Sequence, residues 1–418
     1  MNAFACPLVS PIDARQTVSP VRYLGRQPIV DAQRHLFGYR LVLGPGSSAD
    51  PERATREMID HWLMLLPEAQ TRTLFVHCTR AALVEGLVTL LPAPVAVLGL
   101  LPEINPDPEV TACCDALRRQ GYRLSLEGML PDDPRTALLE FIDCVHFDFP
   151  SSNYDARHAI YRASAGRRFV AGNVATDLQV RLLLSEGCSL FHGPFYAQPS
   201  LAPSAAVPRN YLIYLKLLSA LDREPADLRQ VEKLVSADAS LCYRLLRLAN
   251  SALQAHPGAI STVREALLMV GDDAVRRMAT VAIAGALSGD RSAALLELAL
   301  SRARFCELLA PALPEDAAPM YLLGMISTLE SLLEAPLHTI LQSLPLRPEM
   351  KSALAGDGTR AALALDLVRS LEACDWNECQ RLQRLLALRE NDIAAHYIES
   401  LRWSSSMIAT LAAQEKSA

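Results

Sequence analysis

The sequence lacks any excess of basic residues. Its 418 residues include 40 Lys and Arg against 46 Asp and Glu, which gives a formal net charge of -6 at pH 7. Nucleic acids and anionic membranes are usually held by a basic surface that releases counterions. We therefore expect neither nucleic acid nor a membrane as a partner. The net charge does not exclude a local basic patch on the surface.

The ten cysteines lack the spacing of a metal site. No CxxC motif occurs, and the only close neighbours are Cys113 with Cys114 and Cys374 with Cys379. Structural zinc sites are typically built from closely spaced pairs of cysteine and histidine. Free thiols in a reducing cytoplasm are the expected state of these residues.

The chain also lacks a long uninterrupted apolar run. The stretch 269–287 is among the most apolar, yet it contains Asp272, Asp273, Arg276 and Arg277, which would be costly inside a bilayer. The N-terminal segment carries prolines and charges where a secretory signal needs an apolar segment. These absences predict a cytoplasmic protein without a transmembrane helix.

What the sequence does contain is enough apolar surface for two or three domains, since half of its 418 residues are hydrophobic. In the first half, short β-type runs alternate with amphipathic stretches, a pattern typical of βαβ units. The gap between the first two runs is too short for a crossover helix, which predicts an antiparallel first pair. Eight strands would close a TIM-like barrel of the α/β class. The expected strands are residues 21–27, 36–43, 73–77, 95–100, 123–126, 144–147, 168–170 and 189–191.

The composition changes at residues 197–210, which read AQPSLAPSAAVPRN and predict a short, proline-rich linker. Such a linker favours a limited range of domain orientations. After it, apolar residues recur at helical spacing and no strand run is evident, so the second domain is predicted to be all-α. The expected divisions are a flexible segment at 1–20, the barrel at 21–196, the linker at 197–210, the helical domain with a C-terminal extension at 211–404, and a tail at 405–418.

Two stretches resemble known families. The segment GRQPIVDAQRHLFGYRLVL at 25–43 resembles the opening hairpin of EAL-type cyclic di-GMP phosphodiesterases, whose second strand normally carries Glu-Ala-Leu. The segment LLRLANSALQAHPGAISTVREALLMVGDDAVRRMA at 245–279 resembles the core of HDOD domains, helical relatives of HD-type phosphohydrolases. Their order, together with YIESLRWS at 397–404, resembles a bacterial EAL-HDOD family of signalling proteins.

The resemblance implies where the catalytic metal ligands of the barrel would stand. Phosphodiester hydrolysis in such a barrel uses two divalent ions, and hard cations need several carboxylate ligands at the C-terminal ends of the strands. The glutamate of the EAL motif is replaced by Arg40, whose permanent positive charge would oppose metal binding. Only Glu127 and Asp148 still carry a carboxylate. The matching positions are Arg40, His77, Gly99, Glu127, Gly128, His146, Asp148, Gly172, Ala175 and His192.

These replacements predict a degenerate EAL domain with no catalytic, cofactor-binding or metal-binding residue, and therefore a protein that is not an enzyme. Two interpretations of the three histidines in this set stay open: they could hold a softer metal such as zinc, or they could fill the space of the lost site. Arg40 could pair with Asp148 or Glu127, or it could meet a phosphate group.

The helical domain lacks the residues of a metal-dependent phosphohydrolase. HD enzymes need a His-Asp pair, whereas none of the nine histidines of this chain is followed by Asp. The resemblance therefore implies a regulatory module. The leading hypothesis is a non-catalytic protein that acts through other signalling proteins in bacterial control of motility, biofilm formation or virulence. The alternatives are a cyclic di-GMP receptor with an inactive barrel and a cyclic di-GMP phosphodiesterase with an altered metal site.

Overall fold

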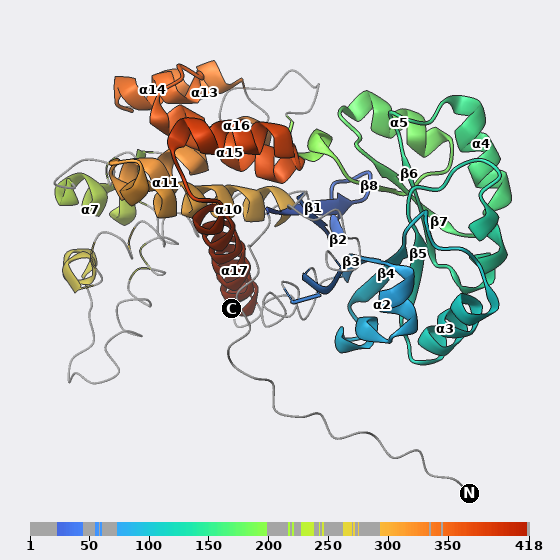
Figure 1. Cartoon of the computed structure of the whole chain (residues 1–418). Helices are drawn as coiled ribbons and strands as arrows, with labels where there is room; N and C mark the ends of the chain where they lie inside the picture. Colours follow the sequence, from blue (N-terminus) through green and yellow to red (C-terminus); the bar gives the residue numbers. More distant parts are fainter. Residues whose placement is uncertain are drawn as a thin grey trace, which may run out of the picture.

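The computed structural model of the chain has a barrel on one side and a bundle of helices on the other (Figure 1). No helix in the part of the chain that it describes is long and apolar enough to span a membrane. The described residues are 23–44, 55–57, 59–60, 73–198, 216–217, 220, 227–237, 242, 245, 262–269, 271, 275, 293–333, 336–343 and 346–415.

The first domain is a closed barrel of eight strands in chain order. β1 pairs antiparallel with β2 and β8, while every other neighbouring pair is parallel. The predicted α/β barrel with an antiparallel first pair is therefore confirmed. The strands are β1 (Leu24–Val30), β2 (Leu36–Leu43), β3 (Thr73–Cys78), β4 (Ala96–Leu100), β5 (Arg123–Leu126), β6 (Cys144–Asp148), β7 (Arg168–Gly172) and β8 (Leu190–Phe191).

The largest departure from the expected strands is at β1, which covers Leu24–Val30 instead of residues 21–27. Pro28 lies inside this strand, although proline cannot donate to a strand ladder. The strand tolerates it because one of its sides is nearly unpaired: β1 meets β8 only at Val30. Treating the proline as the end of the strand therefore placed β1 too early.

Helices α3 (Pro108–Arg119), α4 (Tyr154–Ala163) and α5 (Asp177–Ser185) lie outside the later strands, and the short α2 (Arg80–Val84) follows β3 (Figure 1). Each of the four begins with a side-chain cap that accepts a backbone N–H three residues later. Inside the barrel, an apolar cluster packs at the level of the mid-strands. Its members are Ile29, Phe75, Val97, Cys144, Val170 and Leu190.

The second domain is helical wherever it is described, and the described residues beyond 198 contain no strand, which confirms the predicted all-α class. The segment 1–20, most of the linker and most of the stretch 245–279 lie outside the described residues. The last helix continues past the boundary expected at 404. The helices are α7 (Leu228–Ser236), α10 (Ala293–Leu309), α11 (Ala317–Ile326), α12 (Leu329–Leu333), α13 (Leu337–Ser343), α14 (Pro348–Leu354), α15 (Arg360–Ala373), α16 (Trp376–Leu386) and α17 (Glu390–Glu415).

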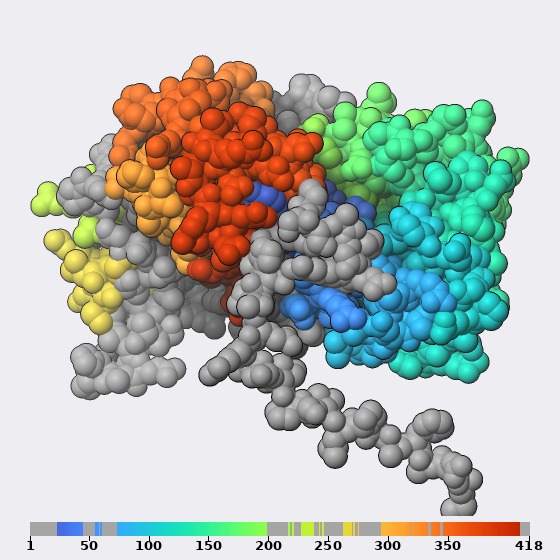
Figure 2. Space-filling view, viewed as in Figure 1, coloured from blue at the N-terminus to red at the C-terminus, as the bar shows by residue number. Residues whose placement is uncertain are grey.

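The helical domain covers the outer face of the β1–β2 hairpin, which has no crossover helix of its own. The ring of Tyr23 stacks on that of Trp376 in α16, with centroids 6.2 Å apart. The Ser331 hydroxyl donates a hydrogen bond to the Ala197 carbonyl, at the end of the barrel. In Figure 2 the blue atoms of the hairpin lie among the red atoms of the C-terminal helices. Buried apolar residues of both domains form one continuous cluster, so the two domains pack as a single unit.

Candidate functional site at the barrel mouth

The interior of the barrel is built in two layers, because alternate residues of each strand face inward. The lower layer is the apolar cluster described above. Two residues farther toward the mouth, most strands place a polar residue or a glycine in the same inward direction. This upper layer lies at the C-terminal ends of the parallel strands, where barrels of this kind carry their active sites. Its members are Gln27, Arg40, His77, Gly99, Glu127, His146, Gly172 and His192.

Three predicted site positions lie outside the upper layer. Gly128 turns away with a positive φ of 58°. The Asp148 carboxylate accepts a hydrogen bond from Asn173 Nδ2 at 2.6 Å, and the Ala175 N–H donates to Oε1 of Gln179 in the first turn of α5 at 2.7 Å. Of the two acidic partners considered for Arg40, the structure places Glu127 beside it, with a guanidinium nitrogen 3.9 Å from the carboxylate.

Glu127 is the centre of the upper layer. Its carboxylate is buried, accepts a hydrogen bond from Ser125 Oγ at 2.7 Å, and lies 3.2 Å from Nδ1 of His146 and 3.3 Å from Nε2 of His77. A guanidinium nitrogen of Arg40 is 3.9 Å away. Burial would raise the pKa of Glu127, but the two imidazoles hold this pKa well below its ordinary value. Glu127 is thus a buried anion whose oxygens already have partners.

Two histidines of the upper layer have lowered pKa values. The pKa of His77 is lowered because burial and the nearby charge of Arg40 both disfavour the imidazolium, and the pKa of His192 is lowered well below its ordinary value for the same reasons. The Nε2 atom of His77 lies 3.2 Å from Arg40 Nε, which donates to it, and 3.3 Å from the Glu127 carboxylate. Arg40 is therefore fixed by an imidazole and a carboxylate from two different strands.

Two glycines of the upper layer stand where the family would have glutamates. A Cβ atom on Gly99 would lie 2.8 Å from Cγ and Oε1 of Glu127, and a Cβ atom on Gly172 would lie 2.8 Å from Nε2 of His192. At both positions the neighbouring side chain would have to shift to admit a Cβ atom. The space of the missing glutamates is thus filled by longer neighbours, which indicates a rebuilt site and not an empty one.

Three buried polar atoms of the upper layer have no hydrogen-bond partner among the described residues: Oε1 of Gln27, Nε2 of His146 and Nδ1 of His192. Buried polar atoms nearly always have a partner in folded proteins. Three such atoms in one layer mark a place where water or a ligand completes the structure. Gln27 was missed at the sequence level, although its spacing of two residues from Ile29 places it on the inward face.

The residues of the upper layer do not fit the pair of divalent metal ions that the fold implies. Within the described ranges no group of three or more His, Cys, Asp or Glu side chains is placed to hold a metal ion. Arg40 stands in a ligand position, and the one carboxylate of the layer is already bound by two imidazoles and Ser125. We therefore derive no step through a metal ion. The arrangement can instead bind an anion through Arg40 and exchange protons through its imidazoles.

A cavity of about 660 Å³ lies between the barrel mouth and the helical domain. The barrel contributes Gln27, Asn173, Gly193, Pro194 and Tyr196 to its wall, the linker contributes Ala197 and Gln198, and the helical domain contributes the rest. No local sequence motif marks these helical residues, because they come from four separate helices or their ends. They include Arg302, Ser327, Glu330, Ser331, Arg369 and Glu372.

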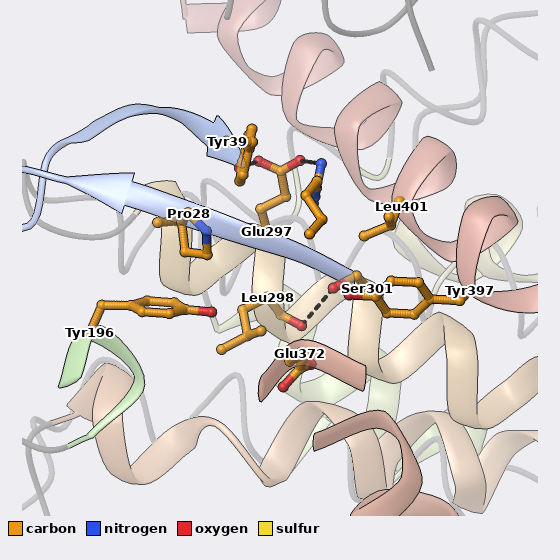
Figure 3. Close-up of a pocket in the computed structure, with 11 residues that line it drawn as sticks. Pro28, Tyr39, Tyr196, Glu297, Leu298, Ser301, Glu372, Tyr397 and Leu401 are labelled. Carbon is orange, nitrogen blue, oxygen red and sulfur yellow. Dashed lines mark hydrogen bonds and ion pairs between the residues drawn. The ribbon is translucent and has the colours of Figure 1, made fainter. Parts of the chain in front are cut away.

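A second contact between the domains lies on the other face of the hairpin. Arg26 donates a hydrogen bond to Glu297 of α10 at 2.7 Å, and Tyr39 donates to the same carboxylate. The Arg26 guanidinium also lies 4.2 Å from the centre of the Tyr39 ring. Figure 3 shows Glu297 beside Tyr39, with Tyr397 and Leu401 of α17 across the strand. Because neighbouring residues of a strand face opposite ways, the hairpin carries the upper layer on one face and this interdomain ion pair on the other.

Comparison with known proteins identifies full-length relatives. The chain is 28% identical over 397 residues to the cyclic di-GMP phosphodiesterase CdgJ of Vibrio cholerae, a match that covers 91% of this chain and 92% of that protein. It is 26% identical over 406 residues to the uncharacterized protein YuxH of Bacillus subtilis, covering 92% and 98%. A solved EAL domain protein from Listeria monocytogenes is 16% identical with a TM-score of 0.33, covering 41% of this chain and 86% of that one.

A family model of the HDOD domain matches residues 207–335, directly after the barrel. The chain thus carries an HDOD domain after its barrel and resembles the EAL-HDOD proteins. The EAL-HDOD order inferred from the two motifs is thereby confirmed. The match of the HDOD model does not bear on the loss of activity that the altered motif implied.

The expectation that this protein is not an enzyme is wrong by comparison with the Vibrio relative. A relative that matches almost the whole chain is named a cyclic di-GMP phosphodiesterase. The expectation rested on one set of lost carboxylates. Losing that set excludes one arrangement of metal ions, but imidazoles and a guanidinium remain at the mouth and can move protons and bind phosphate.

Proposed function

We propose that this protein works in cyclic di-GMP signalling and binds the dinucleotide where the barrel mouth opens into the interdomain cavity. The observation that carries the proposal is the rebuilt upper layer, with Gln27 Oε1 buried and without a partner beside a cavity of about 660 Å³. That volume lies within the range of ligand pockets in proteins. The name of the Vibrio relative supplies the ligand class.

Arg40 is the residue that we assign to a phosphate group. A guanidinium can bind phosphate through two parallel hydrogen bonds. The Nε of Arg40 is bound to His77, and its side chain is 22% exposed, so the rest of the guanidinium reaches the mouth. Fixing the side chain before the ligand arrives lowers the entropy lost on binding.

Hydrolysis of the dinucleotide is the second candidate. It is favoured by the name of the Vibrio relative and by the contact between Glu127 and Nδ1 of His146. A carboxylate that holds one nitrogen of an imidazole leaves the other nitrogen to accept a proton, as in general-base catalysis. In the upper layer that second nitrogen, Nε2 of His146, has no partner among the described residues.

We also propose that the signal is passed to other signalling proteins, in bacterial control of motility, biofilm formation or virulence. Leu178 and Leu182, one helical turn apart on α5, are 69% and 45% exposed and offer an apolar contact on the barrel. A pull-down with the intact protein and with a Leu178→Ser, Leu182→Ser variant tests this contact. Equal recovery of the same partner by both proteins would place the contact elsewhere.

Calorimetric titration with cyclic di-GMP tests the binding proposal. We expect saturable binding to the intact protein and a loss of about tenfold or more in affinity for Arg40→Ala, since a hydrogen bond to a charged group is involved. Arg119→Ala is the control, because that arginine pairs with Asp115 on the surface of α3, away from the mouth. Product analysis of the same mixtures reports whether the dinucleotide is cleaved.

A further inference from the structure

The C-terminal end of α15 lies against the barrel mouth. Gln27 Nε2 approaches the carbonyl of Ala373 at 3.5 Å, and a Cβ atom on Gly25 would collide with the Cys374 side chain. Burial raises the pKa of the Cys374 thiol to about 12, and the charge of Arg40 opposes this rise. A residue of the helical domain is thus within electrostatic reach of Arg40, so the mouth is a boundary shared by both domains.

The two arginines in the helical wall of the cavity, Arg302 and Arg369, differ in burial and in the number of their hydrogen bonds. Arg302 is buried and donates hydrogen bonds to Glu372 at 3.0 and 2.7 Å, which uses its guanidinium for structure. Arg369, one turn before the end of α15, is 39% exposed and pairs only with Asp366 in the described part of the chain, at 3.2 Å. A half-exposed guanidinium on a cavity wall can exchange such a pair for a bound anion, because a surface ion pair contributes little.

We infer that Arg369 contacts a phosphate group of a nucleotide held at the barrel mouth, so that the helical domain completes the binding site. This rests on the proposed function and adds a residue that no EAL barrel alone contains. Gln27 Oε1, on the opposite wall, is an unpaired acceptor suited to an N–H group of a base. The ligand therefore bridges the two domains, with Arg40 on the barrel and Arg369 on α15.

Titration of the intact protein with cyclic di-GMP, at two salt concentrations, tests the inference. We expect Arg369→Ala to weaken binding by about tenfold and to reduce its salt dependence, because one phosphate contact is lost. Arg381→Ala is a matched control: Arg381 is also half-exposed and also pairs with an acidic residue three positions earlier, but on α16 and outside the cavity wall. It should bind as the wild type does.

The outcomes separate the inference from the proposal beneath it. Weaker binding in both Arg40→Ala and Arg369→Ala, with Arg381→Ala unchanged, supports both. Weaker binding in Arg40→Ala with Arg369→Ala equal to the wild type overturns the inference and leaves the proposed function standing. Failure of the wild type to bind cyclic di-GMP overturns both. Circular dichroism spectra and urea midpoints of the variants establish that each is folded.

Discussion

Glu127 occupies the space that a side chain at position 99 would need. A Cβ atom on Gly99 would lie 2.8 Å from Cγ and from Oε1 of that glutamate. The two residues come from neighbouring strands of the barrel, where the resemblance places a glutamate at 99 and a shorter aspartate at 127. The carboxylate expected at position 99 is absent, and the longer Glu127 on the neighbouring strand places its carboxylate in that space. Two imidazoles lie against it.

Gly99→Ala should therefore destabilise the protein. Overpacking of a closed interior typically costs about 1–3 kcal/mol, and the colliding atoms belong to a buried side chain with fixed partners. The measurement is the free energy of unfolding in urea. The same substitution in a Glu127→Asp background should cost less, because the shorter side chain withdraws from position 99. An equal cost in both backgrounds would contradict the packing relation.

Stability should fall as the pH drops from 7.5 to 5.5. The pKa values of His77 and His192 are lowered in the folded protein, so below about pH 6.5 the unfolded chain binds protons that the folded chain does not. Each such proton lowers the unfolding free energy by up to about 1.4 kcal/mol per pH unit. Urea unfolding across this range measures the slope.

The substitution His192→Gln should reduce that slope, because it removes one of the two imidazoles with a lowered pKa. His35→Gln is the matched control, since His35 lies on the surface beside Asp31 with half of its side chain exposed. The prediction fails when both substitutions change the slope equally, because the effect would then not depend on burial.

The ion pair between Arg26 and Glu297 should couple the unfolding of the two domains. Its partners belong to β1 and α10 and are buried. Glu297→Gln would leave the Arg26 charge without its counter-ion, which typically costs about 3–5 kcal/mol. We expect a lower urea midpoint and a separation of the barrel and helical transitions. Asp177→Asn, which removes an Arg34 pair within the barrel, should lower the midpoint without separating them.

The parts of the fold that depend on local pattern could be predicted from the sequence. Alternation of strands and helices gave the barrel, and the short gap before Leu36 gave the antiparallel hairpin. Seven of the ten family positions from Arg40 to His192 lie in the upper layer, because they stand at inward-facing positions within a strand or directly after it. Placement of β1 was wrong where one nearly unpaired edge made Pro28 acceptable.

The rest of the site could not be predicted, because it depends on contacts between distant segments. The sequence shows that Glu127 and three histidines are present, but not that two of the imidazoles bind the same carboxylate. From the sequence alone, Arg369 is predicted to be an ordinary surface residue of a helix. Its place on the cavity wall follows only from the packing of α15 against the barrel. The inference from lost carboxylates to lost activity failed for a related reason. Each position was considered alone, without the contacts among Arg40, Glu127 and the imidazoles that form the upper layer.

We propose that a metal-free layer containing Arg40 binds cyclic di-GMP at the barrel mouth. The most direct test is calorimetric titration of the intact protein with cyclic di-GMP in the presence of EDTA, repeated with Arg40→Ala. We predict saturable binding that survives EDTA and weakens by about tenfold or more in the variant. Binding that requires added Mg²⁺ or Mn²⁺, or that is the same in Arg40→Ala as in the wild type, would contradict the account.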